Sequence, residues 1–137
     1  LLRDNLQKYM DGKLPGVPQD ANKVTIGYNI SREEEEVHFS QEDIDTIYNH
    51  IRGLIDWPVA YGLLENKRVK FFKVRKEYKT CDAVVGTVLG FTDHAMLVAC
   101  KNGILKVYEL QMEGKKKMDA DAFKNGYAQE VCGKVFE

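Results

Sequence analysis

The spacing of apolar residues changes character near residue 57. Before that point, apolar side chains recur every three to four residues in two stretches, 2–12 and 40–54, which is typical of amphipathic helices. Ser40 followed by Asp43 resembles a capping box at the start of the second helix, whose stripe of isoleucines should pack on a core. Between the two helices, residues 24–30 alternate apolar and polar positions, which predicts a short edge strand.

Strand-like patterns dominate after Pro58, because proline cannot continue the preceding helix. Short turns separate five β-type runs, which lie at residues 59–64, 68–76, 84–91, 95–101 and 104–112. Glu65-Asn66 is one expected turn, and Asn102-Gly103 is the dipeptide that a type I′ hairpin prefers. Asp119 can cap a short helix that runs to about Asn125 and is closed by Gly126.

These patterns predict a fold that is mainly β with helices. A helix/strand/helix extension, residues 1–56, would be followed by an OB-like Greek-key β-barrel with a short C-terminal helix, residues 57–137. A β-sandwich with the same elements also fits the pattern. Within the second run, Val69 and Phe71 point one way while Phe72 and Val74 point the other, which indicates a β-bulge near Phe71 or a strand covered on both faces.

Composition narrows the class of protein. With 44% hydrophobic residues the chain can build a core, and no apolar run is long enough to cross a membrane. Three scattered cysteines suit neither a disulfide framework nor a zinc knuckle, so reduced thiols in the cytoplasm are expected. The first residues hold no initiator Met, which suggests a piece of a longer chain.

Charge divides unevenly along the chain, although the net charge is only −1. Residues 1–56 hold 6 basic and 11 acidic side chains, whereas residues 57–137 hold 14 and 10. The run of four glutamates at 33–36 is expected to be a solvated face, since like charges this close repel one another. The second part of the chain is the part expected to meet an anion.

Residues 67–79 hold seven cationic side chains and only one acidic side chain, that of Glu77. Arg68 and Lys70 share a face of the strand, and a second cluster follows at 115–117. If the two clusters lie together, their surface would attract a phosphate backbone; the alternative is a solvated face without a partner. The candidate RNA-binding residues are Lys67, Arg68, Lys70, Lys73, Arg75, Lys76, Lys115, Lys116 and Lys117.

Aromatic residues could also contribute to binding. Trp57 could stack on a base or a folate ring, but a tryptophan at a domain junction is expected to anchor packing. Phe71, Phe72 and Tyr108 lie within apolar strand patterns and are expected in the core. His38, His50 and His94 are scattered, so no metal site is predicted, and neither a P-loop nor a nucleophile with its base is found.

Several ordered motifs lie near the C-terminus: Glu109-Leu110-Gln111, Glu113-Gly114-Lys115-Lys116, Met118, Phe123 and Asn125-Gly126. Together they resemble the C-terminal signature of methionyl-tRNA formyltransferases. A second block resembles the family's passage from linker to C-terminal barrel: Ile51-Arg52-Gly53-Leu54, Trp57-Pro58-Val59-Ala60-Tyr61 and Lys67-Arg68-Val69-Lys70. Pro18-Gln19-Asp20 and Ile30-Ser31-Arg32-Glu33 extend the match towards the N-terminus. His38 departs from the family, which usually has Asp at that place, so no role of that Asp is carried over.

The resemblance implies that residues 1–56 are the tail of a catalytic domain and a linker, and that residues 57–137 help to hold initiator methionyl-tRNA in translation initiation. The family transfers a formyl group from 10-formyltetrahydrofolate to methionyl-tRNA. Its catalytic Asn, His and Asp match no positions here, so the chain is expected to hold no catalytic residue and no cofactor, and to be inactive alone. Its expected partners are methionyl-tRNA and its own N-terminal catalytic domain, without a membrane or a metal.

Two other functions remain open on the residues. One is the C-terminal domain of a different folate-dependent formyltransferase that acts on a small amine such as a sugar nucleotide. The other is a stand-alone OB-type module that binds nucleic acid, which base-stacking aromatic side chains on the surface would favour.

Overall fold

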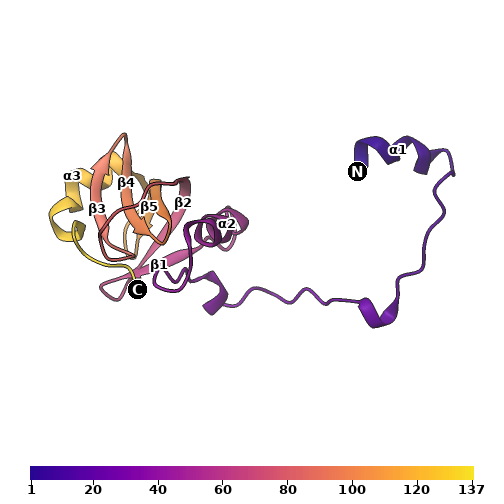
Figure 1. Cartoon of the computed structure of the whole chain (residues 1–137), viewed down its shortest axis with the longest axis horizontal. Helices are drawn as coiled ribbons and strands as arrows, with labels where there is room; N and C mark the ends of the chain where they lie inside the picture. Colours follow the sequence, from indigo (N-terminus) through magenta and orange to yellow (C-terminus); the bar gives the residue numbers. More distant parts are fainter.

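A six-stranded antiparallel sheet curls around one hydrophobic core (Figure 1). The structure is a computed structural model that describes residues 1–137. Its strands are β1 (Tyr61–Leu64), β2 (Lys67–Glu77), β3 (Val88–Thr92), β4 (Ala95–Cys100), β5 (Gly103–Met112) and β6 (Met118–Asp119). Its helices are α1 (Leu2–Met10), α2 (Ile44–Gly53) and α3 (Ala120–Val131), with 3₁₀ turns at Ala21–Lys23 and Glu33–Glu35. The expected class, mainly β with helices and a C-terminal helix, is confirmed.

The strands follow a Greek-key order. They lie side by side as β1-β2-β5-β4-β3, with β6 paired to β5. Strands β3, β4 and β5 form a meander, and the connection after β2 carries the chain across so that β5 returns beside β2. The third strand begins at Val88 rather than near residue 84, because the backbone N–H of Thr87 closes a turn onto the carbonyl of Val84.

The last residues of the chain join the two edges of the sheet. Phe136 bridges to Leu64 at the end of β1, and Val135 bridges to Thr87 just before β3. The backbone N–H of Phe136 donates to the carbonyl of Gly86 at 2.9 Å, and the N–H of Val88 donates to the carbonyl of Lys134 at 2.8 Å. The sheet therefore closes through a segment that follows α3, which the pattern of five runs and a helix did not predict.

Helix α2 packs on the barrel as predicted. Its stripe of Ile44, Ile47 and Ile51 is buried, and the helix lies against β2 and β5. Its cap differs from the prediction: Asp43, not Ser40, accepts a hydrogen bond from the N–H of Thr46 at 2.9 Å. Residues 40–42 are held in a turn onto the carbonyl of His38, so the helix starts one turn later than a capping box at Ser40 requires.

The N-terminal segment confirms one prediction and corrects another. Helix α1 forms, but none of its residues is buried (Figure 1). The prediction of a strand at residues 24–30 is wrong. This stretch is extended and exposed, and no segment pairs with it. Alternation alone makes no strand, because a strand in water needs a neighbour for its backbone groups.

The structure also corrects the roles predicted for Gly103 and Gly126. The β4–β5 turn centres on Lys101 and Asn102, since Cys100 pairs with Gly103, and only Asn102 has positive φ (+68°). The predicted type I′ turn at Asn102-Gly103 is therefore wrong in position and in type, since such a turn needs positive φ at both central residues. Helix α3 continues through Gly126 to Val131, because Phe123 and Val131 are buried and Tyr127 stacks on Phe123 at 5.0 Å. This packing outweighs the cost of a glycine within a helix.

Candidate nucleic-acid interface

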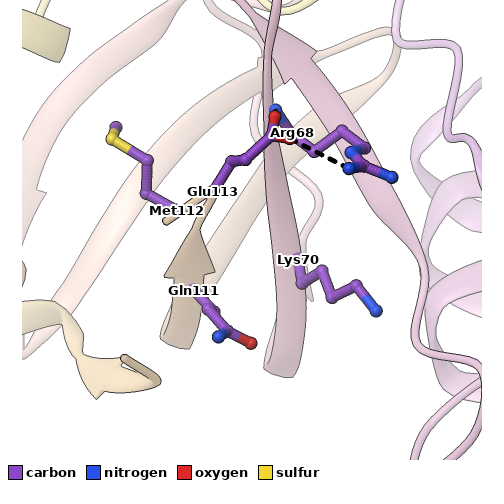
Figure 2. Close-up of a pocket in the computed structure, with 5 residues that line it drawn as sticks. All are labelled: Arg68, Lys70, Gln111, Met112 and Glu113. Atoms are coloured by element: carbon purple, nitrogen blue, oxygen red, sulfur yellow. Dashed lines mark hydrogen bonds and ion pairs between the residues drawn. The ribbon is translucent and has the colours of Figure 1, made fainter. Parts of the chain in front are cut away.

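The outward side of β2 carries the first cluster of cations. Val69 and Phe71 point into the core, so Arg68 and Lys70 project from the other face, as their spacing predicts. Figure 2 shows both side chains extending to the same side of the strand. With Gln111, Met112 and Glu113 of the β5 end, they line an open pocket of about 280 Å³.

Glu113 holds Arg68 in place. Arg68 donates from its guanidinium to Glu113 Oε1 at 2.9 Å and from its backbone N–H to Oε2 at 3.2 Å (Figure 2). These hydrogen bonds lower the pKa of Glu113 and raise that of Arg68. Both side chains are about two-fifths exposed, so the pair is screened by water and stabilises the fold little. A phosphate group can therefore compete with Glu113 for the guanidinium.

Lys70 has a different partner. Its ammonium donates to the carbonyl of Pro58 at 3.3 Å and so ties the segment after α2 to the face of β2. Trp57, next to that carbonyl, is 75% exposed. The expectation that Trp57 anchors packing is wrong for this chain, because its ring lies exposed in the turn at residues 54–58 and outside the core.

The middle of β2 and β5 is irregular on both strands. Phe71 pairs with Leu110 and Val74 with Val107, and all four are buried although each pair is three residues apart along its strand. Because side chains alternate along a regular strand, this spacing requires two consecutive outward residues on each strand. Register shifts on both sides of Lys73 confirm the predicted bulge, and they place Phe72 with Lys73 and Tyr108 with Glu109 on the outer face.

The turn after β5 holds Lys115, Lys116 and Lys117, and we call it the lysine turn. Lys117 lies next to the outer-face side chains of β2 and β5. Lys117 Nζ lies 4.6 Å from the centroid of the Phe72 ring and 2.6 Å from a carboxylate oxygen of Glu109. Lys73 Nζ lies 6.0 Å from the Tyr108 ring. Phe71 is in the core as expected, but Phe72 and Tyr108 are only half-buried, so their assignment to the core is wrong. The phase change near Phe71 was the sequence signal that could have found them.

Lys76 is held apart from the other cations. It forms an ion pair with Asp45 of α2, and its ammonium lies 5.1 Å from the Tyr48 ring and 5.3 Å from the Tyr78 ring. The Asp45 and Tyr78 hydrogen bonds raise the pKa of Lys76, and the pKa of Asp45 is lowered in turn. This cluster fastens α2 to the end of β2.

The nine candidate cations thus fall into two groups. Three form ion pairs with carboxylates: Arg68, Lys76 and Lys117. The other six form none, and they are Lys67, Lys70, Lys73, Arg75, Lys115 and Lys116. Lys115 lies 5.8 Å from the Tyr127 ring of α3, so the lysine turn extends the basic surface from β2 towards that helix.

Other reactive groups lie outside this surface. His94 Nδ1 is 2.5 Å from Asp121 Oδ2, which raises the pKa of His94. Burial raises the pKa of the Cys100 thiol to about 12, so it stays protonated at neutral pH. No group of three or more His, Cys, Asp or Glu side chains is placed to hold a metal ion, and no helix is long and apolar enough to cross a membrane.

These features define a small β-barrel domain with a basic, partly aromatic outer face. Residues 29–128 match the family described as "Formyl transferase, C-terminal domain", so the chain belongs to that family. This finding confirms the resemblance seen in the sequence motifs.

The relatives agree with this family. Methionyl-tRNA formyltransferase of Bacillus cytotoxicus is 37% identical over 138 residues, which cover 100% of this chain and 44% of that protein. The enzyme of the same name from Listeria monocytogenes serotype 4b is 38% identical over 92% of this chain and 40% of its own length. The chain therefore spans less than half the length of the curated relatives it matches. HypX from Aquifex aeolicus, in a crystal structure with tetrahydrofolic acid, shares the fold with a TM-score of 0.68, at 17% identity over 96% of this chain and 23% of its own.

Proposed function

We propose that this chain is the tRNA-holding C-terminal part of a methionyl-tRNA formyltransferase that acts in the cytoplasm during translation initiation. A preceding catalytic domain would transfer the formyl group of 10-formyltetrahydrofolate to the amine of initiator methionyl-tRNA. The observation that carries this proposal is the basic face of β2 and the lysine turn, on a chain whose relatives bear that enzyme's name. Those relatives favour a tRNA acceptor over a small amine.

The unpaired cations would supply the attraction to RNA. Lys73 and Arg75 are exposed on β2, and Lys115 and Lys116 are exposed on the turn. Each such cation that neutralises a phosphate releases a condensed counterion, so affinity should fall steeply as salt rises. Arg68 would join them by exchanging Glu113 for a phosphate, which its planar guanidinium can bind through two parallel hydrogen bonds. Lys76 would contribute only its charge, since Asp45 holds it.

The same proposal assigns a partner to the N-terminal part. In it, residues 1–56 form the tail of the catalytic domain and the linker. Helix α1 exposes Leu2, Leu6 and Tyr9. Together with Leu1, Asn5 and Leu14 they line an open apolar groove with a volume of about 590 Å³. An amphipathic helix with its apolar face in water is stable only when another surface covers that face. The catalytic domain would cover it, and catalysis would be the work of that domain alone.

Binding of methionyl-tRNA across salt concentrations tests this proposal. The double variant Lys73→Gln with Arg75→Gln should weaken binding and reduce the slope of log K against log salt by about one to two units. A matched double variant, Lys8→Gln with Lys101→Gln, removes the same charge from α1 and from the β4–β5 turn and should leave the slope nearly unchanged. Equal slopes for the two double variants would reject β2 as the RNA-binding face.

A further inference from the structure

The paired irregularity of β2 and β5 builds a cluster that phosphate binding does not explain. On two neighbouring strands, Phe72-Lys73 and Tyr108-Glu109 both place consecutive side chains on the outer face. A regular ladder would send one member of each pair into the core. Bulges that re-aim side chains are common next to binding and active sites. Here they bring two aromatic rings, each only partly buried, to the outer face amid cations, although aromatic side chains gain most from burial.

We propose that Phe72 and Tyr108 form a stacking site for an unpaired base of the bound RNA, which deepens and rests on the tRNA-holding function proposed above. Every base has a π-face, so aromatic side chains bind unpaired bases with little regard to sequence, and neighbouring cations hold the adjoining phosphates. A base within a duplex is already stacked on both sides and cannot occupy such a site. The site therefore distinguishes unpaired from paired RNA, which a cationic face alone does not.

Lys73 and Lys117 would leave the two rings when a base binds. In the free chain the ammonium groups of Lys117 and Lys73 lie near the Phe72 and Tyr108 rings, at 4.6 and 6.0 Å from their centroids. A cation–π contact at an exposed site is weaker than base–aromatic stacking. An arriving base would displace these flexible side chains from the rings, and the released ammonium groups would bind the phosphates on either side of it. Glu109 faces the same cluster, and its pairing with Lys117 keeps its charge from repelling the RNA before that exchange.

The alternative is that the rings pack against another protein surface, such as the catalytic domain. The chemistry of the cluster favours RNA, because two lysines lie against the rings and a protein interface is depleted of lysine. The segment that exposes unpartnered apolar side chains for a protein neighbour is α1, which belongs to a different part of the chain.

Two loop-free RNA duplexes with equal numbers of phosphates test the proposal, one blunt and one with an unpaired 3′ tail. The wild-type 137-residue chain should bind the tailed duplex about 5- to 150-fold more tightly than the blunt one at the same salt. Tyr108→Leu and Phe72→Leu should each lose most of that preference while the salt slope stays unchanged. Tyr108→Phe keeps the ring and should bind as wild type does, since the Tyr108 hydroxyl has no hydrogen-bond partner in the chain. Tyr28→Leu removes an exposed ring from the segment before the barrel and should change nothing.

Each outcome is decisive. Equal binding of the two duplexes by the wild-type chain, or a full preference retained by folded Tyr108→Leu, would overturn the stacking site while leaving tRNA binding intact. Failure of the wild-type chain to bind either duplex or methionyl-tRNA would instead reject the proposed function. If the leucine variants lose their thermal unfolding transition, the wild-type comparison of the two duplexes still decides, because it requires no substitution.

Discussion

Gly103 is placed where no larger residue fits. A Cβ at this position would lie 2.7 Å from the carbonyl oxygen of Glu77 and 3.1 Å from Ile44 of α2. Gly103→Ala should therefore destabilise the fold by about 1–3 kcal/mol, since the backbone of β2 cannot easily retreat. The matched control is Gly126→Ala, within α3, where a Cβ would meet nothing within 4 Å. That change should stabilise the fold by about 0.5–1 kcal/mol. Chemical denaturation midpoints that move in the same direction would contradict this contrast.

His94 gives the stability a dependence on pH near neutrality. Its hydrogen bond to Asp121 raises the pKa of His94 above 6.5 in the folded chain. A group whose pKa is higher when folded stabilises the fold fully below its unfolded pKa and loses that contribution as pH rises through the folded pKa. The thermal midpoint should therefore fall as pH rises above about 6.5. Asp121→Asn should remove most of this slope; an identical slope in that variant would assign it to another group.

Two predictions belong to the scale of an element, and the first concerns α2. Ile51 is fully buried in the core, so Ile51→Ala should cost about 2–5 kcal/mol, from lost transfer energy and from the cavity left behind. Leu6→Ala is the matched control, because Leu6 lies on α1 and is nearly half exposed. It should shift the urea midpoint of this chain little. An unchanged midpoint for Ile51→Ala would mean that α2 does not share the core of the barrel.

The second prediction at this scale concerns residues 134–137, which close the barrel. Phe136 is buried and stacks on Phe39 at 5.0 Å, while the neighbouring Val135 is 42% exposed. Phe136→Ala should destabilise the barrel by about 3–5 kcal/mol, whereas Val135→Ala should cost less than about 1 kcal/mol. Hydrogen exchange should also quicken at Val88 in the Phe136 variant, because its N–H bonds to Lys134. Similar costs for the two variants would show that the segment merely lies on the barrel.

Local patterns predicted the elements whose stability is decided locally or by one buried face. The isoleucine stripe of α2 and the strand runs at 68–76 and 104–112 needed only their spacing. The closure by Phe136 could not be predicted in this way, since it depends on a segment meeting Leu64 and Thr87, far away in the sequence. The extent of α3 was missed for the same reason: burial of Val131 offsets Gly126.

The candidate site, too, could be predicted from the sequence only in part. The positions of the cations, and the alternation of Arg68 and Lys70, are visible in the sequence. Which cations are already paired is not visible, because Glu113 and Asp45 approach Arg68 and Lys76 only in the folded chain. The phase change near Phe71 predicted the bulge on β2, but the matching irregularity on β5 follows from the register between the two strands.

At the scale of the molecule, the chain divides into a packed barrel and an extended N-terminal arm. Every residue from 11 to 34 is exposed, and Figure 1 shows α1 well away from the barrel at the end of this stretch. The acidic excess of the first 56 residues lies in residues 35–56, next to the barrel, because residues 1–34 hold five basic and five acidic side chains. RNA on the β2 face would therefore meet little repulsion from the arm, whose own net charge is zero.

This division predicts how the chain responds to limited proteolysis. Trypsin should cut first after Lys13 and Lys23, because exposed segments without tertiary contacts open at almost no cost in free energy. The barrel offers more lysines and arginines, but those on β2 lie in a paired strand that must unfold before it can enter a protease. The fragment that begins after Lys23 should keep the thermal midpoint of the full chain and its affinity for methionyl-tRNA, while losing the apolar surface of α1. The double variant Lys13→Gln with Lys23→Gln, the matched control, should slow the first cut without changing the midpoint. A first cut within β2, or a lower midpoint for the fragment, would show that the arm packs on the barrel in solution.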